Sequence, residues 1–477
     1  MGIRSLGGLP LWSLRFDSDG DPDPAAVADL LAGLRARGVT DLVAFAHGWN
    51  SDRPVADALY EGFFGLLADQ ARRSGPWAEG LGLVGVHWPA RRWPDEPTPD
   101  FGPGPVPVPV GAAATNGPPR PAGTLGRPGL DPATLHALAD AFPTAAPTLR
   151  RLAQLLHTVP TAARVATFAA ELRRFATTVA AGFDDSESAA PPVDSRSADP
   201  PVGGRRADEH GPALPRMLDG DPIEVYARFL DGLRTSGLSI APAAVTGAAG
   251  LTSPLSGIWY GAREALRQVT YWQMKNRAGV IGRYGLGPVL ARLPQVAPGI
   301  RVHLVGHSFG ARLVSFAAAA LPAGAHGPVR SVTLLQAAFS QFAFAPVIPY
   351  PGGRAGALAG LPARIDGPLT VCYSAHDAAL GIFYPLASLA AGDDAAALAA
   401  AGQRFGALGF HGARAVSAAR DPVAVAGRRG AYRFAHRGIL NVDAAAVVRR
   451  GGPPSGAHSD IVHPELAWLV LAAAHLV

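Results

Sequence analysis

The stretch VHLVGHSFGARLVSF, residues 302–316, decides the fold class of this chain. It begins with mostly apolar residues, as a buried parallel strand does, and it ends in residues that favour a helix. Between them lies GHSFG, a G-x-S-x-G sequence at residues 306–310. Such a strand–turn–helix raises its serine above the edge of a sheet, beside the free N–H groups of a helix N-terminus. The stretch predicts a nucleophile at Ser308, with Gly306 and Gly310 allowing the turn to close.

Strands and helices alternate on both sides of this stretch. Continuous apolar runs of strand length indicate buried parallel strands, and apolar residues spaced three and four apart indicate helices. The predicted strands are 9–17, 40–46, 81–88, 301–305, 329–336, 368–374 and the run YRFAHRGILNV, and the predicted helices are 24–37, 53–74, 259–284 and 464–476. This order predicts an α/β fold, with a mostly parallel sheet and helices on both faces.

A long insertion interrupts the alternation. We expect a catalytic domain made of residues 1–93 and 259–477, and an insertion at 94–258. Within the insertion, 131–182 is helical in character, and helical patterns resume near residue 221. Residues 184–216 have the composition of a flexible linker. The insertion is either a lid over a pocket or a low-complexity excursion without a role.

Composition excludes several classes of protein. The formal net charge is only +5 over 477 residues, and no dense arginine cluster is interleaved with aromatic residues, which argues against a nucleic-acid partner. Cys372 is the single cysteine, so neither an intrachain disulfide nor a cysteine zinc site is expected. No apolar stretch is long enough to span a membrane, and no signal peptide is evident. We therefore expect a cytoplasmic protein without a membrane span, a metal or a cofactor.

Two further motifs accompany the turn at GHSFG, residues 306–310, which we call the elbow. HGWN, residues 47–50, directly follows a predicted strand, and HSD, residues 458–460, lies in a Gly- and Pro-rich loop before the last predicted helix. With GHSFG, these motifs make the chain resemble the α/β-hydrolases, and more narrowly the bacterial serine hydrolases often described as serine peptidase-like. The resemblance covers about residues 9–93 and 259–477. It implies an oxyanion hole formed by the backbone N–H groups of Phe309 and of Trp49, with Gly48 as the alternative to Trp49.

The resemblance also implies a catalytic acid and a base. In this fold the chain order is Ser, acid, His. Asp377 follows the predicted strand 368–374, where the acid is expected, although an aspartate there is also a common helix cap. Of the histidines that follow it, His458 holds the family's position and His463 is the alternative. Asp460 is expected to cap a local turn, and His307 to pack against or shape the elbow.

These residues predict a serine hydrolase. Ser308 would attack an ester, thioester or amide, His458 would act as base, and Asp377 would orient it. The substrate would be a small molecule or a peptide. Two alternatives stay open: a serine peptidase on the same scaffold, and a non-catalytic binding module that retains the fold.

Overall fold

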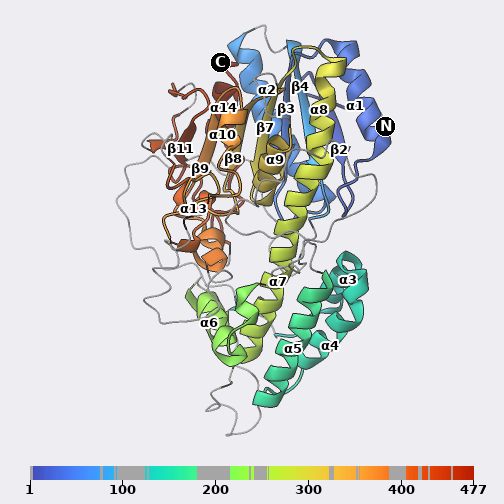
Figure 1. The fold of residues 1–477 in the computed structure, drawn as a ribbon, viewed down its shortest axis with the longest axis vertical. Helices are drawn as coiled ribbons and strands as arrows, with labels where there is room; N and C mark the ends of the chain where they lie inside the picture. Colours follow the sequence, from blue (N-terminus) through green and yellow to red (C-terminus); the bar gives the residue numbers. More distant parts are fainter. Residues whose placement is uncertain are drawn as a thin grey trace.

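The protein is an α/β structure built on a mostly parallel sheet, as seen in a computed structural model (Figure 1). This arrangement confirms the predicted class of fold. The structure describes residues 4–75, 79–90, 93, 124–125, 128–179, 215–235, 238–240, 255, 257–321, 327–350, 353, 355–385, 404–416, 422–427, 430–452 and 455–477.

Nine strands of the described residues form the main sheet, in the order β1-β2-β4-β3-β7-β8-β9-β11-β10. Only the edge pair β1–β2 is antiparallel, and the other neighbouring pairs in this sheet are parallel. The strands are β1 (Arg4–Leu6), β2 (Leu9–Arg15), β3 (Asp41–Ala46), β4 (Leu81–His87), β7 (Arg301–His307), β8 (Val329–Leu335), β9 (Leu369–Tyr373), β10 (Val423–Ala424) and β11 (Ile439–Asp443). The carboxyl ends of the parallel strands therefore share one edge of the sheet.

Helices cover both faces of the sheet. One face carries α1 (Pro24–Arg37), α8 (Gly287–Val296) and α9 (Phe309–Ala319), and the other carries α2 (Arg53–Ser74) and α14 (Pro464–Ala473). Residues of β3 alternate between the two cores: Leu42 belongs to the first, and Val43 to the second. Burial of both faces explains why this strand is apolar throughout after its first residue.

Two predicted elements differ from the structure. The run YRFAHRGILNV is a strand only from Ile439, because Arg437 has a positive φ of 55° and turns the chain just before it. The helix predicted over 259–284 is α7 (Ile258–Val280), and it continues through a π-helical turn (Ile281–Leu286) into α8 without an intervening loop. Gly282 allows the close approach there, since a Cβ on it would lie 2.2 Å from the carbonyl oxygen of Leu313.

A helical lobe lies below the sheet (Figure 1). We use this name for four helices of the insertion and the N-terminal half of α7, which runs from the lobe up to the sheet. The four helices are α3 (Pro132–Ala141), α4 (Ala146–Leu156), α5 (Ala162–Val179) and α6 (Pro222–Thr235). The helical prediction for 131–182 is thus confirmed as far as Val179, and 180–182 lie outside the described residues, but prolines divide the segment into three helices. The predicted linker at 184–216 lies outside the described residues, apart from its last two.

Aromatic side chains hold the lobe together. The ring of Phe168 lies 5.8 Å from that of Tyr226 and 5.6 Å from that of Trp259, centroid to centroid. A Cβ on Gly261 would lie 1.8 Å from the carbonyl oxygen of Tyr226, so α6 and α7 are in backbone contact. The apolar core of the lobe is continuous with that of the sheet face that carries α9. Lobe and sheet are therefore packed against each other rather than separate.

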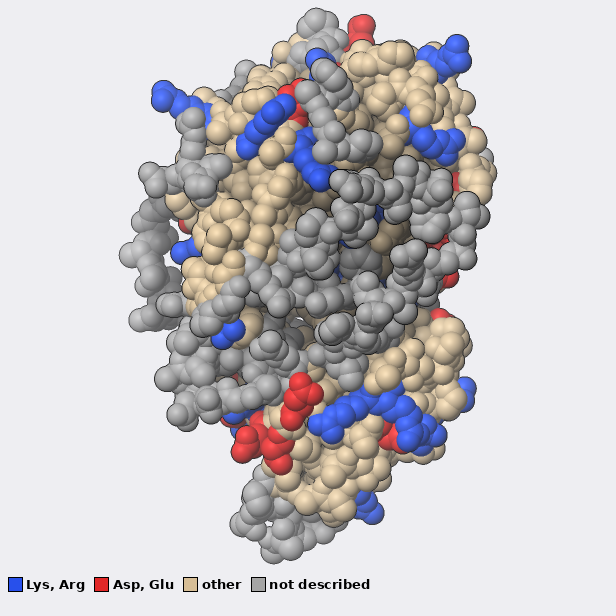
Figure 2. Space-filling model, viewed as in Figure 1, with Lys and Arg blue, Asp and Glu red and all other residues tan. Residues whose placement is uncertain are grey.

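Charged side chains are interspersed on the face of the molecule in Figure 2, among the described residues. An example in the lobe is Arg151, whose Nε lies 3.1 Å from a carboxylate oxygen of Glu171 and joins α4 to α5. Exposed pairs of this kind contribute about 0 to 1 kcal/mol each. The core, and not the surface charge, holds the helices together.

Candidate active site

Ser308 occupies the turn between β7 and α9. Its backbone has φ 56° and ψ −120°, a combination that residues with a side chain rarely adopt. The residue is 3% exposed and lies at the N-terminus of α9. The strained turn directs the hydroxyl toward the carboxyl edge of the sheet, where the loops after other strands reach it.

Both glycines of GHSFG are required by the packing. A Cβ on Gly306 would lie 2.4 Å from the Cα of Ala311, and a Cβ on Gly310 would lie 2.0 Å from the carbonyl oxygen of Ala46. Backbone atoms cannot give way as side chains do. The elbow therefore closes only because neither position carries a side chain.

The register of β3 against β7 brings HGWN to the elbow. Ala46 is the Cα partner of Gly306, so the residues that follow each strand emerge side by side. A Cβ on Gly48 would lie 2.7 Å from the Cβ of Ser308 and 2.9 Å from Nδ1 of His307. The glycine of HGWN thus lets its loop lie directly against the serine.

The structure brings Ser308, His458 and Asp377 together. Nε2 of His458 lies 2.9 Å from Oγ of Ser308, and Nδ1 of His458 lies 2.7 Å from Oδ2 of Asp377. A carboxylate only accepts hydrogen bonds, so Nδ1 carries the proton, and Nε2 is left to accept the serine hydroxyl. These are the contacts that a base needs to activate a serine.

Asp377 both caps a helical turn and contacts the histidine. Its Oδ1 accepts a hydrogen bond from the N–H of Leu380 at 3.0 Å, while Oδ2 faces His458. The residue has no exposed surface. The two interpretations of this residue that the sequence offers are therefore compatible, because each uses a different oxygen.

The other residues of the HSD region hold the loop. Asp460 accepts hydrogen bonds from the backbone N–H groups of Arg449 and Arg450, at 2.9 and 2.8 Å, and lies 2.9 Å from Nε2 of His463. These contacts lower the pKa of the Asp460 carboxyl, although its burial opposes them. Asp460 stabilises a turn as predicted, and His463 contacts Asp460 instead of the serine.

The two predicted oxyanion donors lie beside the serine. Phe309 is the first residue of α9, where backbone N–H groups have no partner within the helix, and Trp49 lies in the HGWN loop. Within the described part of the chain, no hydrogen bond uses the backbone N–H of either residue. Both groups are thus available to bind an anionic oxygen.

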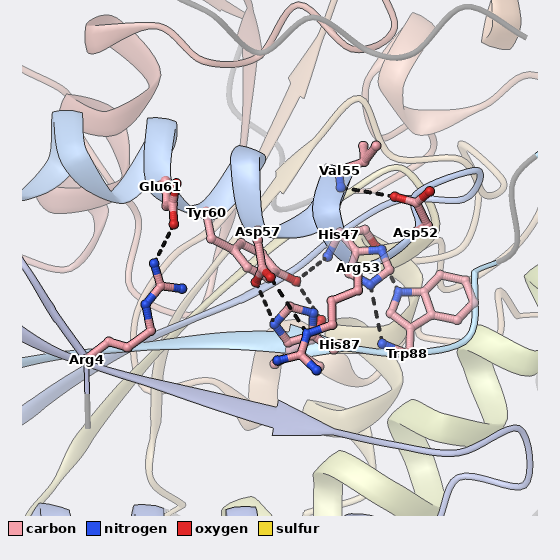
Figure 3. A network of polar contacts seen from close by, with 11 residues as sticks. Arg4, His47, Asp52, Arg53, Val55, Asp57, Tyr60, Glu61, His87 and Trp88 are labelled. Carbon is pink, nitrogen blue, oxygen red and sulfur yellow. Dashed lines mark hydrogen bonds and ion pairs between the residues drawn. The ribbon is translucent and has the colours of Figure 1, made fainter. Parts of the chain in front are cut away.

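A buried polar network supports the HGWN loop (Figure 3). The hydroxyl of Tyr60 donates to the carbonyl of Val86 at 2.6 Å and accepts from the N–H of His47 at 3.2 Å. The indole of Trp88 donates to the carbonyl of His47 at 2.9 Å, and the two rings stack. Burial and the nearby His87 lower the pKa of His47 to about 3, so its ring is neutral. This network fixes the loop without adding charge to it.

His87 extends the network toward the surface (Figure 3). Its Nε2 lies 3.4 Å from Oδ1 of Asp57, and Nε of Arg53 lies 3.7 Å from Oδ2 of the same carboxylate. Burial, with Arg53, Arg15 and Arg4 nearby, lowers the pKa of His87 to about 4. The contact with Asp57 is therefore not an ion pair near neutral pH.

Aromatic rings from four parts of the chain meet next to the elbow. The ring of Tyr271, on α7, lies 4.4 Å from that of Phe309, 5.2 Å from that of Trp49 and 6.5 Å from that of Tyr384. Nζ of Lys275, the only lysine in the chain, lies 3.1 Å from the hydroxyl of Tyr384. Sequence reasoning missed Tyr271 and Tyr384, because nothing in their helical patterns distinguishes them from core residues.

No group of three or more His, Cys, Asp or Glu side chains among the described residues is arranged to hold a metal ion. None of the described helices is both long and apolar enough to cross a membrane. Comparisons with models of known families, with curated proteins and with solved structures find no match to this chain. What the site does must therefore be argued from its own geometry.

Proposed function

We propose that the protein is a serine hydrolase of the α/β-hydrolase fold, acting on an ester, thioester or amide through an acyl-enzyme. The observation that carries this proposal is the chain of contacts from Ser308 through His458 to Asp377, at 2.9 and 2.7 Å. The order of these residues along the chain, Ser, Asp, His, is that of the α/β-hydrolases, and so is the position of the serine between strand and helix.

In the first step Oγ of Ser308 attacks the substrate carbonyl while its proton passes to Nε2 of His458. The negative charge that develops on the carbonyl oxygen is stabilised by the N–H groups of Phe309 and Trp49, and one such donor contributes about 3 kcal/mol. His458 then gives its proton to the leaving group, and the acyl-enzyme forms. Water, activated by His458, releases the acid and restores the serine. Asp377 holds the imidazole tautomer throughout.

The surroundings of the serine favour an apolar acyl group. Tyr271 lies against the rings of both residues that would supply the oxyanion donors, so the wall next to the reacting carbonyl is aromatic. Apolar walls with a few directed polar groups are typical of small-molecule sites. A serine peptidase on the same scaffold would stabilise the same oxyanion. Such a peptidase, which cleaves a main-chain amide, is the second candidate function.

A fluorophosphonate probe tests the proposal. We expect wild type to be labelled at Ser308, and Ser308→Ala to lose labelling. Ser315→Ala is the matched control, because that buried hydroxyl only donates to the carbonyl of Ala311 within α9. His458→Ala should slow labelling, whereas His463→Ala should not. p-Nitrophenyl esters of rising chain length, run beside peptides, separate esterase from peptidase. No labelling of folded wild type would favour the non-catalytic binding module.

A further inference from the structure

His307 is a second histidine at the nucleophile that the proposed mechanism does not use. It ends β7, is 3% exposed, and precedes Ser308 in the chain. Its Nε2 lies 2.8 Å from the backbone carbonyl oxygen of His458, and the two rings are 5.1 Å apart between centroids. A carbonyl oxygen only accepts, so Nε2 of His307 is the donor.

The bond holds the backbone of His458 in the base loop, a name we use for residues 455–463, and this backbone has few other anchors. The backbone N–H of His458 makes only a long hydrogen bond, 3.4 Å to the carbonyl of Ser455. On either side, Ala457 donates to the carbonyl of His376 at 2.9 Å, and Asp460 holds the loop farther on. Among Ser308, Asp377 and His458, the side chain of His458 is the most exposed, at 15%. The bond to its carbonyl therefore anchors the backbone of His458, in addition to the contacts of its side chain with Asp377 and Ser308.

The chemistry of His307 suits this task. Burial and the neighbouring His458 lower the pKa of His307 to about 3, so the ring stays neutral while His458 gains and loses a proton. Nδ1 then has no proton, and it has no hydrogen-bond partner in the described residues. A donor is thus delivered to the base loop without a second positive charge beside the base.

We infer that His307 is a positioning residue, which ties the backbone of His458 to the strand that carries the nucleophile. Base and serine are then held by one element, so their separation does not depend on how the loop 444–463 moves as a whole. This inference rests on the proposed hydrolase function for its effect on rate, but its effect on the loop is independent of activity. A displacement of about 1 Å in such a group can cost about 100-fold in rate.

The test compares His307→Gln with His307→Leu in the full-length protein. Glutamine places an amide N–H near the position of Nε2, whereas leucine fills similar space without a donor. We expect His307→Leu to lower kcat for a p-nitrophenyl ester about 10- to 100-fold with KM nearly unchanged. His307→Gln should stay within about threefold of wild type, because its amide N–H keeps the hydrogen bond to the carbonyl of His458. If His307→Leu melts early, His307→Met replaces it.

Hydrogen exchange of the peptide covering 455–463 provides the readout that does not need activity. We expect faster exchange in His307→Leu and wild-type exchange in His307→Gln. Equal exchange and equal kcat in the leucine and glutamine variants would overturn the inference. If wild type were inactive, the proposed function would fail, and the exchange result alone would decide the role of His307.

Discussion

The sheet and the helical lobe achieve order in different ways. In the sheet, strand pairing fixes the relative positions of residues that are far apart in sequence. The pairing of Ala46 with Gly306, for example, places the HGWN loop against the elbow. In the lobe, helices are held by rings such as Phe168 and Trp259, and no strand pairing joins these helices within the part of the chain that the structure describes. Strand pairing thus explains why the site residues lie at the strand ends, while α7, which runs up from the lobe, contributes Tyr271 to their surroundings.

The two regions meet along α7. The indole of Trp93 donates to the hydroxyl of Thr270 at 3.1 Å, and its backbone N–H donates to the side chain of Asn50 in the HGWN loop. The guanidinium of Arg277 lies over the ring of Phe142 and donates to the carbonyl of Pro89 at 3.3 Å. A change in the lobe can therefore reach the site through this helix and its neighbours.

The largest expected difference between the sheet and the lobe is in how far a substitution changes the labelling rate of Ser308. Asp377→Asn should slow labelling of Ser308 by about 10³- to 10⁴-fold, because the amide cannot hold the same histidine tautomer. The matched change in the lobe is Glu264→Gln, at a buried carboxylate that accepts from Gln268 at 2.7 Å. Its labelling rate should equal that of wild type. Similar losses in both variants, measured on folded protein, would mean that reactivity does not depend on the sheet edge alone.

Two glycine substitutions, one in the sheet and one in the lobe, show how well each region tolerates a steric clash. Gly310→Ala puts a Cβ against the backbone of β3, and should cost more than about 4 kcal/mol and abolish labelling. Gly261→Ala creates a similar clash with the carbonyl of Tyr226, but helices can shift apart, so labelling should survive below the melting temperature. Gly65→Ala on α2 meets nothing within 4 Å and serves as the control. Thermal unfolding and labelling are measured together, and a wild-type melting temperature in Gly310→Ala would contradict the argument.

Two phenylalanines test whether the regions unfold together. Phe168 in the lobe and Phe63 on α2 are both fully buried, so replacing either with alanine should cost about 3 to 5 kcal/mol. Because one apolar core runs from Phe168 to α9, we expect each variant to melt in a single, lowered transition. Calorimetry reports this directly. Two separated transitions in Phe168→Ala would show that the lobe is an independent unit.

Acid should destabilise the protein through groups of the sheet. The histidines with a lowered pKa among the described residues, His47, His87, His303 and His307, all lie in or next to its strands. Since the unfolded chain binds their protons near pH 6.5 and the folded chain does not, stability falls as pH drops below about 6.5. For His87, with a folded pKa of about 4, the loss by pH 4 is at most about 3 kcal/mol. Melting temperature against pH should be flatter in His87→Gln, and an unchanged slope would contradict this.

Much of the sheet could be predicted from the sequence, because a strand buried on both faces is a continuous apolar run. β3 is the clearest example. The elbow could be predicted because local geometry requires its two glycines, and because a serine between them matches the G-x-S-x-G pattern. The subdivision of the lobe needed attention to prolines such as Pro143, Pro147 and Pro160, which interrupt an otherwise helical pattern.

Other features of the site depend on tertiary contacts that leave no local pattern. Tyr271 has the spacing of a core residue, and only the path of α7 from the lobe to the sheet brings it to Phe309. The bond from His307 ends on a backbone carbonyl, which every residue type possesses, so no choice of amino acid at position 458 could have revealed it. Motif and chain order could select His458 over His463, but not the anchors that hold its loop.

If Ser308 is the nucleophile that we propose, its positive φ places selection for activity and selection for stability in conflict at one residue. A non-glycine residue in such a conformation costs about 1 to 3 kcal/mol. Ser308→Gly should therefore raise the melting temperature while it removes the nucleophile. If the serine is kept only for chemistry, a related chain that lost the reaction would gain stability by replacing this serine. The residue at this turn would then indicate whether the reaction is still in use.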